Sequence, residues 1–286
     1  MPKPSGTENI RESTILLGNI FWLAALASLI IALVYPIYCY LSLNIDIVID
    51  PDYFYKVFIP ICIPIILLAS ITPRLDQKWW LRVAVIIVLS AIIALAINNK
   101  IELGIIAGMI CFASICLIGQ TLDYVLVESH YFSKNLPSNK ISLFLAHGGF
   151  GLLALAIVLN CALSREVKFI GQVGDKINQK GLSVKLENVK FSESLNYFRQ
   201  IAVFRIEDEK NNIVTLKPEN RLYKIEKSLS QEVDIFSFLF YDLYAVLSQV
   251  DQKTIHAQIY YQPFISFIWL SVIIIASGFL ISVRKK

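Results

Sequence analysis

Residues 143–163 read LFLAHGGFGLLALAIVLNCAL, an apolar run that contains one histidine, His147. A helix needs roughly 17–25 mostly apolar residues to cross the hydrocarbon core of a bilayer, so this run predicts a transmembrane helix. An ionisable ring inside such a helix is costly and usually has a function. The fold class and the first candidate site therefore both start from this stretch.

The whole chain shares this apolar character. It has 286 residues, of which 56% are hydrophobic, and a mean hydropathy of +0.61. This excludes a soluble protein and predicts a polytopic α-helical membrane protein with six transmembrane helices. The predicted helices cover about residues 14–41, 57–73, 80–97, 102–127, 143–163 and 263–283. We expect the first to be retained, because it is too long for the core of a signal peptide.

Basic residues mark one side of the predicted membrane domain. Lysine and arginine occur near both termini and in the segments 74–82 and 134–140, whereas the opposite connections carry Asp46, Asp50 and Asp52 or the nearly neutral segment 98–100. The positive-inside rule therefore predicts both termini on the cytoplasmic or matrix side. The formal net charge of +4 is then mostly topological. We expect a lipid bilayer as partner and no nucleic acid.

A polar insert at residues 165–262 separates the membrane domain, residues 1–164 with five helices, from the final helix and basic tail at 263–286. Apolar and polar residues alternate at 182–186, 202–206 and 255–261, and turn signals occur at 179–181, 209–212 and 217–220. These patterns predict an extracytoplasmic (periplasmic) all-β domain, barrel or sandwich-like, inserted before the last helix. The insert contains no cysteine and no recognisable catalytic constellation. The catalytic residues are therefore unknown at this point.

His147 allows two interpretations. On a helix, His147, Gly151, Ala154 and Val158 share one face. Imidazole is a common ligand of haem iron, and small residues such as Gly148 and Gly151 would let a flat macrocycle lie close to the backbone. The same pattern also suits close helix packing, with the histidine hydrogen-bonded across the interface. Because no other histidine lies in a predicted span, a second axial ligand would come from another chain.

Several short motifs occur in an order that resembles a known family. They are Tyr35-Pro36, Tyr53-Phe54, Leu145-Ala146-His147-Gly148-Gly149, Asn196-Tyr197, Pro218-Glu219-Asn220-Arg221-Leu222-Tyr223, Asp242-Leu243-Tyr244 and the start of the last span at 263–270. No single motif is specific, but the ordered set resembles the carboxy-terminal portion of CcmF, the haem lyase component of cytochrome c maturation. The family's tryptophan-rich segment and its other transmembrane haem-ligand histidine have no match here, so the chain resembles the carboxy-terminal piece of a split form.

The resemblance implies a haem-binding subunit of a lyase that attaches haem to the CxxCH motif of apocytochrome c. His147 would be one axial ligand of a membrane haem b. Activity would need the tryptophan-rich amino-terminal half as a separate chain. Further partners would be a haem chaperone, apocytochrome c and its thiol-handling subunit, at the bacterial or mitochondrial inner membrane.

In the outer domain, the same resemblance makes Pro218, Arg221 and Tyr223 an expected exposed docking patch, although a fixed turn that enters a strand would explain them as well. The alternative to the lyase as a whole is a non-enzymatic membrane scaffold or permease subunit whose outer domain binds a partner.

Overall fold

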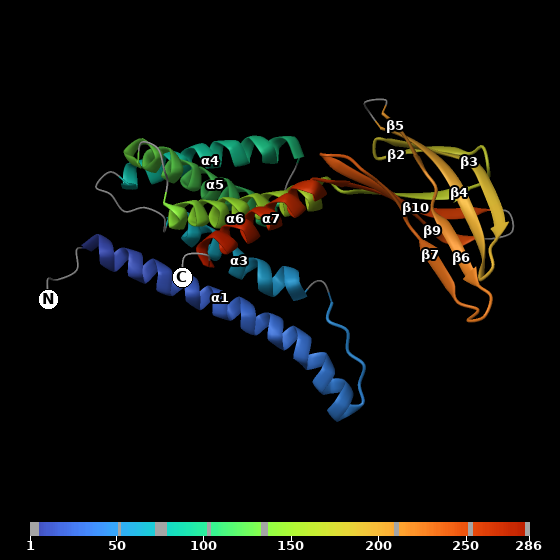
Figure 1. Cartoon of the computed structure of the whole chain (residues 1–286), viewed down its shortest axis with the longest axis horizontal. Coiled ribbons are helices and arrows are strands. Elements are labelled where there is room, and N and C mark those ends of the chain that lie inside the picture. Colours follow the sequence, from blue (N-terminus) through green and yellow to red (C-terminus); the bar gives the residue numbers. More distant parts are fainter. Residues whose placement is uncertain are drawn as a thin grey trace. The chain divides into compact units, whose positions relative to one another are not determined.

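The computed structural model describes residues 6–50, 53–71, 79–101, 104–132, 137–208, 212–250 and 254–283. The chain divides into two compact units. One is helical and comprises residues 1–158 and 268–286, and the other is strand-rich and comprises residues 159–267. Figure 1 shows the helices and strands of both units in sequence colours.

The helices and π-turns of the described chain are α1 (Gly6–Tyr38), η1 (Cys39–Leu43), η2 (Phe54–Phe58), α3 (Ile59–Ile71), α4 (Trp79–Ile101), α5 (Ile105–Phe132), α6 (Ser138–Leu163) and α7 (Ile265–Val283). Among the described residues, five helices are long and apolar enough to cross a membrane: α1 continued by η1, and α4 to α7. The chain is therefore a multi-pass membrane protein. The predicted count of six is not confirmed, because the span expected at 57–73 is a shorter apolar helix, Lys56–Ser70.

Proline explains the irregular start of this shorter helix. Pro60 has no N–H, and its ring would crowd the carbonyl one turn earlier in a regular helix. The chain instead enters α3 through η2, where the Ile59 N–H donates to the Phe54 carbonyl across a wider turn. Several of the basic residues used to orient the spans, including those at 74, 78 and 134 and the last three residues, lie outside the described residues.

The strands are β1 (Arg165–Gly171), β2 (Lys176–Gln179), β3 (Leu182–Glu193), β4 (Tyr197–Asp208), β5 (Ile213–Leu216), β6 (Glu219–Tyr223), β7 (Leu229–Glu232), β8 (Asp234–Ser237), β9 (Tyr241–Val250) and β10 (Ile255–Pro263). They form one sheet in the order β1-β10-β9-β8 and a second in the order β2-β3-β4-β6-β7, with β5 also paired to β4. The predicted all-β class is confirmed, and of the two forms expected, barrel or sandwich, the two sheets form a sandwich. The extracytoplasmic placement stays a prediction.

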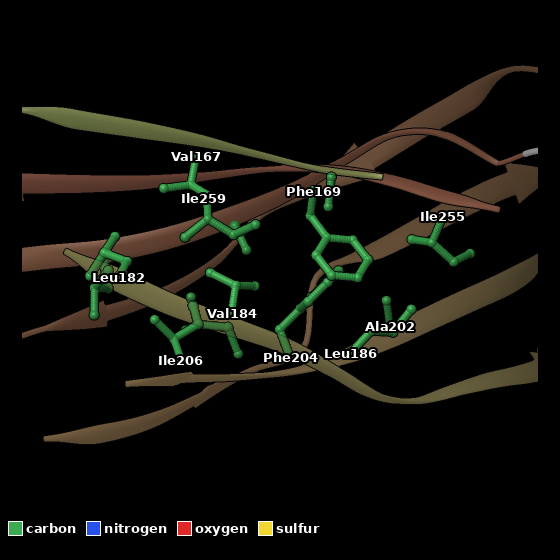
Figure 2. Close-up of a cluster of buried hydrophobic side chains, with 14 of the residues drawn as sticks. Val167, Phe169, Leu182, Val184, Leu186, Ala202, Phe204, Ile206, Ile255 and Ile259 are labelled. Atoms are coloured by element: carbon green, nitrogen blue, oxygen red, sulfur yellow. The ribbon is translucent and has the colours of Figure 1, made fainter. Parts of the chain in front are cut away.

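The core of this unit lies between the two sheets, as Figure 2 shows. Alternate residues of the strands point inward, as in Leu182, Val184 and Leu186 of β3, which are all buried. The rings of Phe169 and Phe204, one from each sheet, meet edge to face with their centroids 5.2 Å apart. Burying one such side chain contributes about 1.5–3 kcal/mol, so the core stabilises the unit without any cysteine in the sequence between residues 162 and 262.

Two of the predicted turns have different outcomes. The turn at 179–181 is confirmed as the β2–β3 hairpin, in which Lys180 and Gly181 have φ of 50° and 75°. Positive φ at both positions is typical of a type I′ hairpin turn, which glycine favours. The turn expected at 209–212 falls mainly on residues outside the described ranges.

The turn predicted at 217–220 is wrong. Here β5 and β6 run one after the other along β4, with Leu216 opposite Phe204 and Glu219 opposite Ile201. The Pro218 carbonyl still accepts a hydrogen bond from the Ala202 N–H at 3.1 Å. Proline cannot donate in return, so it interrupts the strand pair without turning the chain.

Candidate functional site

His147 projects from α6 with one ring nitrogen already engaged. Its Nδ1 lies 3.1 Å from the carbonyl oxygen of Leu143, one turn earlier in the same helix. Because a carbonyl can only accept, the neutral ring carries its proton on Nδ1 and leaves the lone pair of Nε2 free. A backbone carbonyl that holds one ring N–H is the usual support of a metal-ligating histidine. The ring is half-buried, and its Nε2 has the chemistry of an axial ligand.

The strip below His147 is not an open surface for a macrocycle. A Cβ built on Gly151 would lie 2.8 Å from Cγ1 of Ile118 and 3.3 Å from the carbonyl oxygen of Ser114, both in α5. Farther along the strip, Val158 packs in one cluster with Cys111 of α5. The structure therefore contradicts the expectation that a flat ring lies against Gly151. Helix packing, the alternative interpretation of this strip, explains Gly151 because α5 fills the space.

Gly148 differs from Gly151. The nearest atom to a Cβ built on Gly148 is Cγ2 of Thr121, at 3.6 Å, which is an ordinary van der Waals contact. A methyl group would fit there without displacing α5. We therefore expect enlargement to be tolerated at Gly148 and poorly tolerated at Gly151.

The opposite side of α6 packs against α7. A Cβ on Gly149 would lie 2.8 Å from Cγ1 of Ile275, and one on Gly278 would lie 3.0 Å from the backbone nitrogen of Ala146. The hydroxyl of Ser142 donates to the carbonyl of Gly278 at 2.8 Å. Small residues of this kind let membrane helices approach closely. They fix the helix that carries His147 between α5 and α7.

An ion pair in the same unit was missed in the sequence. Arg82 of α4 lies 3.5 Å from a carboxylate oxygen of Asp123 in α5, and both side chains are less than one-third exposed. Asp123 follows Thr121, the residue opposite Gly148, by two positions. The positive-inside rule accounts for Arg82 only as a topological charge, although an aspartate inside the apolar run 102–127 is itself a signal for a paired charge.

The docking patch expected in the outer domain is also corrected. Pro218 is fully buried, so its ring cannot contact a partner. The Arg221 guanidinium binds Glu219, lies 3.5 Å from Glu232 and sits 5.2 Å from the ring centre of Tyr197. The hydrogen bond to Glu219 raises the pKa of Arg221. Arg221 is thus held in a charge cluster on the face of the sheet rather than in an exposed patch with Pro218.

Within the described ranges, no cluster of three or more histidine, cysteine, aspartate or glutamate side chains could hold a metal ion. Among the described residues, Nε2 of His147 could bind a haem iron as one ligand. These residues do not provide a complete set of ligands for the iron.

Fold and site together define a class: a multi-pass membrane protein with a β-sandwich unit between its last two helices and one ligand-competent histidine in the first of them. Residues 162–263 match the family described as CcmF C-terminal beta-sandwich. The chain is 24% identical over 284 residues to the cytochrome c-type biogenesis protein CcmF of Pseudomonas aeruginosa, covering 94% of this chain and 43% of that protein. The CcmF of Haemophilus influenzae is 27% identical over 286 residues, with 94% and 44% covered.

A solved structure titled Cytochrome c Heme Lyase CcmF has the same fold, with a TM-score of 0.75 at 15% identity over 95% of this chain and 45% of that one. The chain thus spans less than half the length of the relatives it matches. Along nearly its whole length, it is related to the carboxy-terminal portion of CcmF, as its ordered motifs predicted.

Proposed function

We propose that this chain is the haem-binding part of a cytochrome c haem lyase, which helps attach haem to the CxxCH motif of apocytochrome c. The observation that carries the proposal is the 3.1 Å bond between Nδ1 of His147 and the Leu143 carbonyl, which leaves Nε2 free for iron. Relatives named for cytochrome c-type biogenesis support the same process. When bound, a haem b would supply one-electron redox chemistry in the membrane.

The chain's own residues would hold and orient that ligand. The Leu143 carbonyl selects the tautomer of His147, and the glycine contacts of α6 with α5 and α7 fix the helix. The His147 side chain would therefore lose little conformational freedom when it binds the iron. A Cβ on Gly148 would have its nearest neighbour at 3.6 Å, in Thr121 of α5, whereas Gly151 supports the helix packing. A bis-histidine haem would take its second ligand from the tryptophan-rich amino-terminal half of the lyase.

The proposal includes a location and partners. The spans would lie in the bacterial or mitochondrial inner membrane, with both termini on the cytoplasmic or matrix side and the β unit on the other side. There the β unit would meet the haem chaperone, apocytochrome c and its thiol-handling subunit. Tyr223 and the edge of the charge cluster around Arg221 remain as the proposed docking face, without Pro218.

The test uses this chain co-expressed with the amino-terminal half of the lyase. His147→Gly should abolish most of the low-spin haem b absorption of the purified complex and lower the cytochrome c yield. His256→Ala in β10 is the matched control and should keep both. Added imidazole should restore the absorption of His147→Gly, because it supplies the missing ligand, whereas it could not repair a purely structural defect. A full, unshifted spectrum in His147→Gly would show that the ligand assignment is wrong.

A non-enzymatic membrane scaffold remains the second candidate, and one observation favours it. The small-residue face of α6 is used for packing against α5, as in a helix bundle without a cofactor. A scaffold predicts that the complex assembles equally well with His147→Gly and that no haem is released, since none was bound to this chain.

A further inference from the structure

The tip of the β8–β9 hairpin is apolar on nearly all of its surface. We call residues 235–240 the apolar hairpin, in which Ser237 is the one polar residue. Its large side chains are exposed to these extents: Ile235 58%, Phe236 40%, Phe238 53%, Leu239 60% and Phe240 52%. The rings of Phe236, Phe238 and Phe240 line an open cleft of about 610 Å³ rather than the packed core. In water, neighbouring exposed apolar side chains in the edge strand β8 and in the turn that follows it would promote aggregation.

This apolar hairpin is bonded to the residue that precedes a transmembrane helix. The Phe264 N–H donates to the Phe240 carbonyl at 2.8 Å, and α7 begins at Ile265. The hydroxyl of Ser266 donates to the Phe238 carbonyl at 3.3 Å, and the rings of Phe240 and Phe267 have centroids 5.8 Å apart. The apolar hairpin therefore lies next to residues 264–267, where the chain enters α7.

The end of α6 also lies next to the start of α7. The Asn160 side-chain amide donates to the Pro263 carbonyl at 2.6 Å, and the Ser164 hydroxyl donates to the Gln262 side chain at 2.7 Å. The end of one span, the start of the next and the apolar hairpin are thus tied together by hydrogen bonds. All three belong to the same compact unit.

We infer that the apolar hairpin inserts into the interfacial layer of the bilayer beside α7 and forms a second membrane contact of the β unit. Phenylalanine and leucine side chains at such a position gain the free energy of leaving water, and interfacial segments typically enter about 5–10 Å. Asp242 lies opposite Ser237 in the β8–β9 pair. Because a carboxylate is costly to move into the bilayer, we expect the hairpin to insert no deeper than Asp242. The occupant of this surface is lipid because the surface continues from the start of a membrane-spanning helix.

The chain offers a matched control at the other end of the β unit. Ile225 is 90% exposed in the turn after β6, whose last residue Tyr223 pairs with Tyr197 at the start of β4. The cleft lined by the apolar hairpin includes Asp208, at the opposite end of β4. Ile225 is therefore an exposed apolar side chain far from the hairpin.

The test places a photoreactive benzoylphenylalanine in the full chain, reconstituted in vesicles of phosphatidylcholine and phosphatidylglycerol. Leu239→benzoylphenylalanine should form a phospholipid adduct to roughly the extent of Leu280→benzoylphenylalanine, a 67% exposed position in α7. Ile225→benzoylphenylalanine should form several-fold less. Mass spectrometry of the photolysed protein measures the adducts.

Leu239 is exposed, so the replacement costs little folding free energy, and the Leu280 variant shows that lipid adducts can be detected. Lipid adduct at Leu239 no greater than at Ile225 would overturn the inference. Cross-linking of Leu239 to a second protein chain without lipid adduct would overturn it as well, in favour of a protein partner.

Discussion

Gly148 and Gly151 give the sharpest test of how α6 is held, because they are neighbours on one helix with different surroundings. We expect Gly151→Ala to destabilise the helical unit and Gly148→Ala to leave it unchanged or slightly more stable. A Cβ at position 151 would lie 2.8 Å from Cγ1 of Ile118, whereas one at position 148 has its nearest neighbour at 3.6 Å.

The magnitude follows from two opposing terms. Replacing glycine by alanine in a helix gains about 0.5–1 kcal/mol from backbone entropy, and this gain is the same at both positions. Inserting a methyl group into a packed interface costs about 1–3 kcal/mol. At position 151 the contacts include the backbone of α5 at Ser114 and a β-branched side chain, which yields little, so the helices have to separate. The Gly151→Ala variant should therefore be about 1–3 kcal/mol less stable than Gly148→Ala.

Unfolding of the purified protein in mixed micelles with added sodium dodecyl sulfate, followed by circular dichroism, measures this difference. The two variants should unfold with the same slope against detergent and different midpoints. Equal midpoints, or a lower midpoint for Gly148→Ala, would show that α6 does not pack against α5 in this way.

Three further predictions concern the β unit and the topology. Phe204→Ala removes a fully buried ring and should cost about 3–5 kcal/mol, seen as faster hydrogen exchange of the strands; unchanged exchange would contradict the core assignment. Tyr244 stacks on Tyr260 with ring centroids 4.7 Å apart, and burial raises the pKa of Tyr244 in the folded protein. The stability that the neutral Tyr244 contributes is therefore complete below its pKa in the unfolded chain, about 10. This stability is lost as the pH rises through the pKa of Tyr244 in the folded protein. Tyr244→Phe should weaken this alkaline loss in pH-dependent unfolding, and an identical profile would exclude Tyr244 as its source. Reporter fusions after Lys140 should be cytoplasmic and fusions after Gly181 exported, and the reverse pattern would overturn the positive-inside assignment.

Much of the architecture is encoded locally. Long apolar runs without charges have to form helices in a membrane, because only internal hydrogen bonds satisfy the backbone there. Alternating runs such as residues 182–186 suit strands with one buried face. Gly181 marks a hairpin turn, because the turn requires positive φ at Lys180 and Gly181 and glycine adopts positive φ readily. The ordered motifs were sufficient to indicate the relationship to CcmF, because a family relationship can be recognised from the order of sequence motifs without knowing which residues are in contact.

Local patterns failed where a residue's neighbours in space decide its role. Pro218 resembles a turn residue, yet the pairing of both β5 and β6 with β4 makes it a buried interruption of an extended strand. Composition predicts a span at 57–73, where the described chain has a shorter apolar helix at 56–70, so the count of six is not confirmed.

For the candidate site, the sequence by itself determined that one histidine lies in a membrane helix above a strip of small residues. Only the tertiary structure decided that the strip packs against α5 and that Gly148 and Gly151 differ, because both depend on which atoms of another helix lie within a few ångströms. The bond from Nδ1 of His147 to Leu143 depends on the side-chain rotamer. The apolar sequence 235–240 is a local feature, but its hydrogen bonds to the beginning of α7 join segments that are separated along the chain and adjacent only in the fold.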